Sequence, residues 1–223
     1  MPGLRQAVQE LIATGAKTSD PSSLQPLANA VYEASKSSLG MECEEAVALL
    51  SAGLSVNRPL SSGWFAITAG GLVEKGASPI ILIEALLRGL PELCTLANAF
   101  ADEARQAALS PEQSKNCEGR TDGIWLRNRF LSVEDFQTRR AENKAGSRAA
   151  KALELWLKPS ISCFSLVASA RARAGATLRI APALADLLPF AGWLRELLAV
   201  LDNERLLVLH PGCGLGFRLR MSG

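Results

Sequence analysis

Histidine is almost absent from this sequence, which contains only one, His210, in 223 residues. A single histidine excludes metal sites built from several imidazole ligands. It also leaves room for at most one catalytic pair of histidine with serine or cysteine. The cysteines are odd in number, widely spaced and never arranged as C-x-x-C: Cys43, Cys94, Cys117, Cys163 and Cys213. We therefore expect neither a disulfide framework nor a structural zinc site, and the sequence indicates no metal and no cofactor.

Long apolar runs are also missing. The longest uncharged stretch, 59–73, is shorter than the ~18–20 apolar residues that cross a bilayer, and it contains three glycines. The N-terminal segment carries Arg5 and Glu10 within its apolar pattern, so it lacks the uninterrupted apolar region of a secretory signal. We expect no transmembrane segment and a cytoplasmic location.

Aromatic residues make up only 5% of the sequence, so the core must be built mainly from Leu, Ala, Ile and Val. Apolar residues recur with helical spacing as far as about residue 200, beginning with Leu4, Val8 and Leu11. Leu and Ala are also strong helix formers. The sequence predicts a mainly α protein, either a multi-helix bundle or a short helical array, with a small C-terminal β-hairpin.

Prolines mark the clearest helix boundaries in the first half of the chain. Ser78 and Pro79 are typical of a helix start, and the apolar stretch 80–87 that follows predicts the central core helix. Pro91 then predicts the start of a separate helix that ends near residue 109.

The charges divide the chain into unequal parts. Residues 1–118 carry 8 Lys and Arg against 13 Asp and Glu, whereas residues 119–179 carry 12 against 5. The last part, 180–223, is balanced, so the net charge of +2 hides the asymmetry. We predict an acidic helical domain (1–113), a loop or linker (114–123), a basic helical region (124–204) and a hairpin (205–223).

The basic region contains an ordered stripe of positive charge. Ser132 is a plausible cap for a long helix over 133–157, with Gly146 as a place where it could bend and Pro159 as its stop. On such a helix, one narrow arc holds four cations: Arg140, Lys144, Arg148 and Lys151. Ala145, Ala149, Leu153 and Trp156 fall on the opposite side.

Three interpretations of this stripe stay open. It can be an ordinary solvated helix face, or it can contact the acidic half of the same chain. It can also bind an anionic partner such as a nucleic acid, an acidic protein surface or a lipid headgroup layer. No nucleic-acid-binding motif accompanies it.

A glycine-rich stretch near the C-terminus has the letters of a cofactor loop. The run 208–216, VLHPGCGLG, resembles the first loop of S-adenosylmethionine-dependent methyltransferases, in which a strand ends at glycines that lie under the cofactor. That resemblance implies a helix directly after the loop. Here 217–221, FRLRM, alternates apolar and charged residues, which is typical of a strand. The context therefore favours a hairpin turn over a cofactor loop.

We predict strands at 205–210 and 217–221, joined by a turn at 211–216. The second strand ends the chain, and its free edge is a template for another chain, so Phe217 and Leu219 are candidate partner-binding residues. The leading hypothesis is a non-enzymatic protein interaction or scaffold module that self-associates or docks a protein through this hairpin. One alternative is nucleic-acid or anionic-surface binding by the basic helix. Another is an enzyme with a site near His210, which lies three residues from Cys213.

Overall fold

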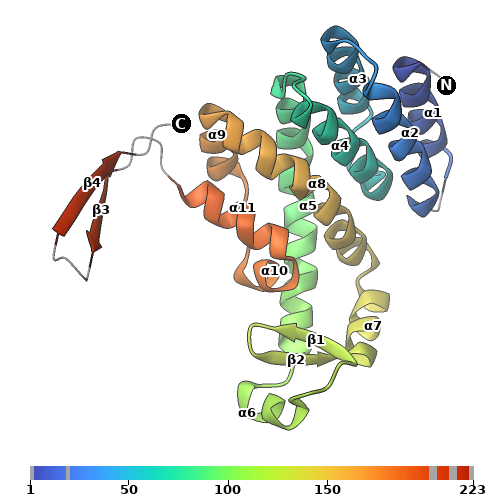
Figure 1. The fold of residues 1–223 in the computed structure, drawn as a ribbon. Coiled ribbons are helices and arrows are strands. Elements are labelled where there is room, and N and C mark those ends of the chain that lie inside the picture. Colours follow the sequence, from blue (N-terminus) through green and yellow to red (C-terminus); the bar gives the residue numbers. More distant parts are fainter. Residues whose placement is uncertain (1–2, 19–20, 201–204, 211–214, 221–223) are drawn as a thin grey trace.

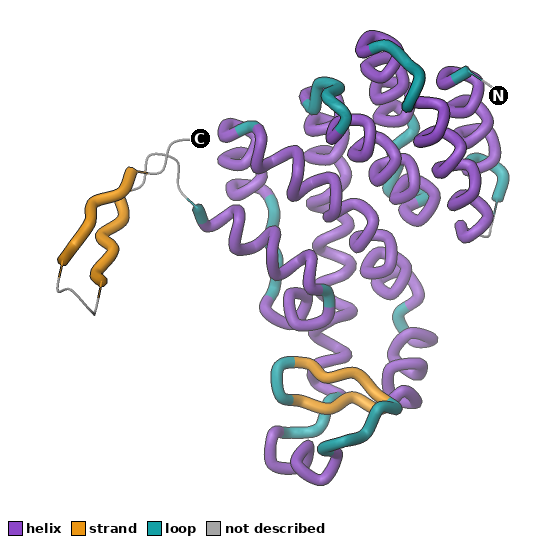
Figure 2. Tube along the Cα trace, in the orientation of Figure 1, coloured by secondary structure: helices purple, strands orange, loops and turns teal. Residues whose placement is uncertain are grey.

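The computed structural model describes residues 3–18, 21–200, 205–210 and 215–220 (Figure 1). Within these ranges the chain is mainly α-helical, as Figure 2 shows, and it forms eleven α-helices and four short strands. The helices are α1 (Leu4–Gly15), α2 (Gln25–Ser35), α3 (Gly40–Ala52), α4 (Pro59–Glu74), α5 (Ile80–Ala107), α6 (Pro111–Ser114), α7 (Val133–Glu142), α8 (Lys144–Leu166), α9 (Ala168–Thr177), α10 (Pro182–Leu187) and α11 (Pro189–Ala199). The strands are β1 (Gly123–Leu126), β2 (Arg129–Ser132), β3 (Arg205–His210) and β4 (Leu215–Arg220).

The N-terminal helices form a layer beside the central part of the molecule. α1 packs against α2 and α3, and α3 packs in turn against α4 and α5 (Figure 1). The predicted spacing in α1 is confirmed, since Leu4, Val8 and Leu11 are all buried. Their periodicity places them on one helix face, which the neighbouring helices cover.

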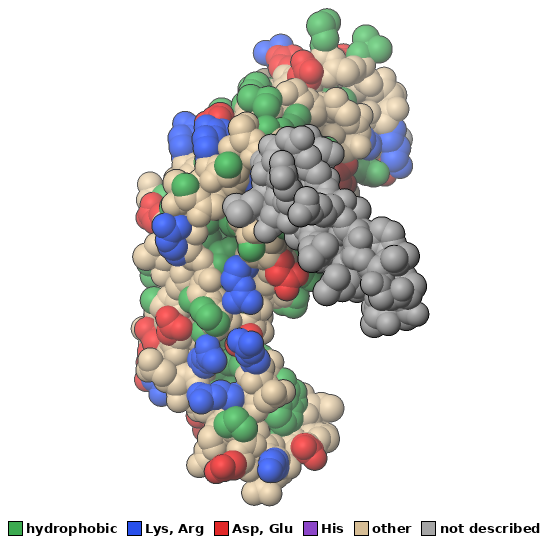
Figure 3. Space-filling view, turned by 90° about the vertical axis from the view of Figure 1, so that its left-hand side faces the viewer, with side chains coloured by type: hydrophobic (Ala, Val, Ile, Leu, Met, Phe, Trp, Pro, Cys, Tyr) green, Lys and Arg blue, Asp and Glu red, His purple; other side chains and the backbone are tan. Residues whose placement is uncertain are grey.

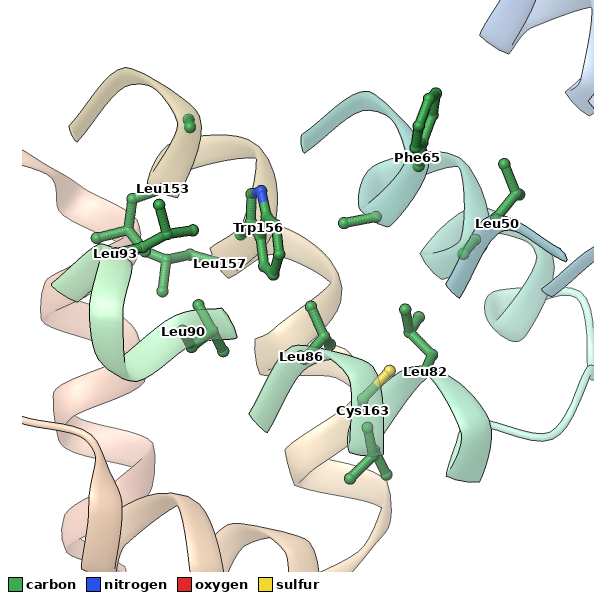
Figure 4. Packing of buried hydrophobic residues seen from close by; sticks show 14 of the residues in the cluster. Leu50, Phe65, Leu82, Leu86, Leu90, Leu93, Leu153, Trp156, Leu157 and Cys163 are labelled. Carbon is green, nitrogen blue, oxygen red and sulfur yellow. The ribbon is translucent and has the colours of Figure 1, made fainter. Parts of the chain in front are cut away.

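The core lies between α4, α5 and α8, to which α5 contributes Leu86 and Leu90, α8 contributes Leu153 and Trp156, and α4 contributes Phe65 (Figure 4). One hydrophobic cluster includes buried residues from both 1–113 and 124–204. The two ranges differ in charge and share a core.

The expected break at Pro91 is wrong, because α5 continues through it for 28 residues. A proline inside a helix removes one backbone hydrogen bond at a cost of about 3 kcal/mol. Leu86 and Leu90, before Pro91, and Leu93, after it, are fully buried. Burying each side chain stabilises the fold by about 1.5–3 kcal/mol, which outweighs the missing bond.

The predicted single helix over 133–157 is also corrected. The chain leaves helical geometry at Asn143, three residues before the expected bend at Gly146, and this separates α7 from α8. The predicted stop at Pro159 is wrong as well, because α8 runs on to Leu166. Pro159 packs directly on α4 at Gly70. A side chain at position 70 would leave no room for the proline ring.

The hairpin that packs on the helices lies in the middle of the chain, where the sequence predicted a loop and then helix. β1 and β2 pair antiparallel from Gly123↔Ser132 to Leu126↔Arg129, and they contact α5, α7 and α10. Arg127 and Asn128 form the two-residue turn with φ of 43° and 68°. Leu126 and Leu131 are buried in a small cluster with Ala104 of α5. Each of these strands has only four residues, which is too short for a period-two pattern to be recognised in the sequence.

At the C-terminus, the backbones of β3 and β4 pair antiparallel, with Leu206 opposite Leu219 and Val208 opposite Phe217. Part of the expected turn, 211–214, lies outside the described residues.

Candidate functional site

The four predicted cations line one depression, although they come from two helices. Arg140 lies near the end of α7, and Lys144, Arg148 and Lys151 lie in the first turns of α8. All four are exposed. Together with Leu60 and Ser147 they line a hollow of about 180 Å³. We call these four residues the basic cluster.

The junction between α7 and α8 positions the basic cluster. The Asn143 side chain accepts a hydrogen bond from the Gly146 amide at 2.8 Å and so caps the start of α8. Its Nδ2 donates to Glu103 Oε1 of α5 at 3.1 Å. Gly146 is buried, and a Cβ there would lie 2.8 Å from Phe100 Cβ, so only glycine allows this close approach. These contacts hold the first turn of α8 against α5.

The opposite side of α8 is buried in the core. Ala149, Leu153 and Trp156 are each no more than 1% exposed, which confirms the predicted apolar face. Ala145, expected on the same face, is exposed, because it lies in the first turn of α8, directly after the junction. The Trp156 indole nitrogen donates to the Pro59 carbonyl oxygen at 3.1 Å and ties α8 to the start of α4.

No carboxylate within the described ranges lies within 4.0 Å of a nitrogen of the basic cluster. The neighbouring Arg139 pairs with Glu142 at 3.0 Å instead. An ion pair between the basic region and the acidic half joins Arg173 to Glu84 of α5 at 2.6 Å. The cluster's charges are therefore open to solvent and to an external anion.

An apolar pocket of about 310 Å³ adjoins the basic cluster. Its apolar walls come from four helices and a strand: Phe100, Ile124, Phe136, Ala150, Leu187 and Leu188. The Phe100 and Phe136 rings meet edge to face, with centroids 5.8 Å apart. Arg140, Ser147 and Lys151 line both this pocket and the basic depression, so the two hollows lie side by side.

Among the described residues, the polar side chains that line the two hollows are cations and the Ser147 hydroxyl, and no described carboxylate or histidine lies in either wall. Ser147 therefore has no base beside it that would make it a nucleophile. The arrangement can hold an anion next to an apolar group, and it offers no general acid–base pair. Figure 3 shows Lys and Arg side chains interspersed with hydrophobic ones along one face of the molecule.

The apolar pocket could not be found from the sequence. Its walls come from α5, β1, α7, α8 and α10, and Phe100 of α5 is far from Leu187 of α10 along the chain. Phe136 was visible near the stripe, but no periodicity connects it with Ile124 or Leu187.

The C-terminal candidates are placed only through their backbone. Phe217 and Leu219 lie in β4, and their part in partner binding stays a prediction. Part of the methyltransferase-like run 208–216 and Cys213, the expected neighbour of His210, lie outside the described residues.

The described cysteines are all buried: Cys43, Cys94, Cys117 and Cys163. Burial raises the pKa of the Cys94 and Cys163 thiols to about 12. Both are therefore protonated at neutral pH and poor nucleophiles. Their role is to fill the core.

Among the residues that the structure describes, no three His, Cys, Asp or Glu side chains gather as metal ligands would. In the same part of the chain, no helix combines the length and the apolar character needed to cross a membrane. The function must therefore be argued from the basic cluster and the apolar pocket. Comparison of the chain with family models, curated proteins and solved structures returned no match.

Proposed function

We propose that this protein is a non-enzymatic interaction module whose basic cluster binds an acidic stretch of a partner protein. One observation carries the proposal: four cations from two helices line one depression without a carboxylate partner among the described residues. Like charges held together repel one another, and an acidic segment would relieve that repulsion.

The surroundings of the cluster favour an acidic protein over a nucleic acid. Single-stranded nucleic acids are usually held by exposed aromatic rings that stack on bases. The exposed Trp125 lines a different hollow, with Pro111 and Glu118. The ring beside the cluster, Phe136, is half-buried in the wall of the apolar pocket.

A lipid surface is also a poorer match for the site. Helices that bind membranes insert their apolar face at the interface. The apolar face of α8 packs against α4 and α5 and is not free to insert.

Binding of a fluorescent Glu-rich peptide, measured by anisotropy at about 50 and 300 mM salt, tests the proposal. Replacing all four cluster cations by Gln should weaken binding by about tenfold or more, because each exposed contact contributes about 0.2–1 kcal/mol. Added salt should weaken binding to the unchanged protein in the same direction.

The matched control replaces four exposed cations elsewhere, Lys17, Arg88, Lys115 and Arg195, by Gln. It removes the same charge and should leave the affinity within about threefold of the original. Equal losses in both variants would contradict a specific site. If an oligonucleotide or anionic vesicles bound more tightly than the Glu-rich peptide, that class of partner would take the place of the acidic protein in the proposal.

Self-association through 205–223 is a second candidate. Its support is the pairing of β3 and β4 as a two-stranded sheet, in which each strand has an edge that the described residues do not pair. Light scattering on the full chain and on a chain lacking 205–223 tests it. A full chain that is already monomeric would refute self-association.

A further inference from the structure

We infer that the acidic segment bound by the basic cluster carries one large apolar side chain, which enters the apolar pocket. This inference rests on the proposed function and adds to it the anchor that selects the partner. The occupant of the two hollows is a short peptide segment of a protein, in which Phe, Trp or Leu lies next to acidic residues.

The shared border of the two hollows carries the inference. Arg140, Ser147 and Lys151 border both, so a side chain in the pocket places its neighbours along the peptide at the basic depression. Charge complementarity then favours acidic neighbours, because every charged group in either wall is a cation.

The size of the pocket limits the anchor. A dry apolar cavity of ~150 Å³ holds one benzene molecule. The pocket here measures about 310 Å³, roughly twice that volume, which gives room for one Phe, Trp or Leu side chain. Interfaces commonly derive most of their affinity from one such anchor in a desolvated pocket.

The walls of the pocket provide apolar surface that the described chain leaves uncovered. Ile124, Phe136, Leu187 and Leu188 are only half-buried although they surround one hollow. Contiguous exposed apolar surface with a polar rim typically marks a binding site. The edge-to-face pair of Phe100 and Phe136 offers a wall on which a third ring can pack.

Other hollows of the described residues lack this combination. The hollow of about 510 Å³ beside Arg58 has a mixed wall of apolar side chains and serine hydroxyls, and that guanidinium already donates to the Ala16 carbonyl oxygen. The hollow of about 430 Å³ beside Trp125 contains both Lys115 and Glu118, so its charges oppose one another.

Three peptides of equal length test the inference on the full chain: an all-Glu peptide, a Glu peptide with one central Phe, and a Lys peptide with one central Phe. The acidic Phe peptide should bind about tenfold or more tightly than the all-Glu peptide, because a Phe ring leaves water. The Lys peptide should bind weakest. Equal affinity of the two acidic peptides would overturn the anchor and leave the proposed function intact. If neither acidic peptide bound, the proposed function itself would fail.

Two variants fill the pocket from α8. Ala150→Leu and Ser147→Leu each replace a small side chain in the wall of the pocket by a larger apolar one. In each variant the affinity ratio of the Phe peptide to the all-Glu peptide should fall from about tenfold to below about threefold. The ratio is compared within one variant, so a general change in affinity cancels. The two positions give independent tests if one variant fails to fold.

Ala13→Leu is the matched control, since it adds the same side chain at an exposed position of α1. It should keep the full ratio. A ratio that persists in both pocket variants would show that the Phe side chain binds elsewhere. If phenylacetate competed as strongly as the Phe peptide, the site would be one for small aryl acids. That result would overturn the proposal that a peptide occupies it.

Discussion

The two ends of α8 differ in what they contact. Its C-terminal part contributes many side chains to the core, and Trp156, Leu157, Cys163 and Phe164 have no exposed surface. Even Ser160 is fully buried there, and its hydroxyl donates to the Trp156 carbonyl oxygen. The first turns of the same helix carry Lys144, Arg148 and Lys151 on an exposed face beside a hollow.

The difference shows how one helix can serve stability and binding in separate segments. α4 and α5 enclose the C-terminal part, and small residues such as Gly63 and Gly70 let α4 approach closely. At the N-terminal end, Gly146 brings the helix against α5, while the exposed side keeps charges that bind no carboxylate of the described chain. Substitutions should therefore affect stability at one end and partner binding at the other.

Removing the indole of Trp156 should produce the largest loss of stability. Trp156→Ala leaves a cavity between α4, α5 and α8 and leaves the Pro59 carbonyl without its donor. The free energy of unfolding should fall by about 3–5 kcal/mol. Urea denaturation followed by circular dichroism measures it. Trp193→Ala is the control, since that side chain is 59% exposed, and it should cost about 1 kcal/mol or less. Equal losses would contradict the difference in burial.

Adding one methyl group to α4 should test how closely it approaches α8. In Gly70→Ala the new Cβ would lie 2.5 Å from Pro159 Cβ and 3.2 Å from its Cα, so backbone has to move. A loss of about 1–3 kcal/mol in the free energy of unfolding is expected. The next residue is the control, because a Cβ at Gly71 meets only Tyr32 Cδ2 at 4.0 Å. Gly71→Ala should be neutral or stabilise the helix by up to about 1 kcal/mol. An unchanged free energy of unfolding in Gly70→Ala would contradict a close contact between Gly70 of α4 and Pro159 of α8.

A smaller effect is expected at the junction that separates the two segments. Asn143→Ala removes the cap of α8 and the partner of Glu103, and should lower the free energy of unfolding by about 1 kcal/mol. Asn143→Ser keeps an oxygen that can accept from the Gly146 amide, so thermal denaturation should show it recovering part of that loss. No difference between Ala and Ser would argue against the capping role.

The elements that local chemistry determines could be predicted from the sequence. Ser132 caps its helix, as expected, by accepting from the Asp135 amide at 3.1 Å, and Ser110 forms a capping box with Gln113. Lys144, Arg148 and Lys151 share an exposed face of α8, as their helical spacing predicts, whereas Arg140 precedes the break at Asn143 and lies on α7. Each of these features depends on neighbours within a few residues.

The features that depend on contacts between distant segments could not be predicted. Pro91 and Pro159 each suggest a helix end, and both helices continue because the surrounding core repays the missing hydrogen bond. Leu187 joins Phe100 in the pocket wall although 87 positions separate them in the sequence. Only the packing of α10 near α5 brings them to one hollow.

The smallest expected effect has opposite signs at Arg148 of α8 and Arg139 of α7. Arg148 lies four residues after Lys144 and three before Lys151, and like charges at these helical spacings destabilise by about 0.2–0.5 kcal/mol per pair. Arg148→Gln should therefore raise the free energy of unfolding by several tenths of a kcal/mol at low salt. The gain should disappear at high salt, where the repulsion is screened.

Arg139→Gln is the matched control, because Arg139 is bound to Glu142 at 3.0 Å and its loss should lower stability by a similar amount. Urea titrations of both variants at about 20 and 500 mM salt measure the two signs. A loss of stability in Arg148→Gln would mean that the cluster stabilises the fold. The cluster would then serve to stabilise the fold. A gain of stability in Arg148→Gln would mean that repulsion among the cluster charges destabilises the fold, and an acidic partner can offset that repulsion.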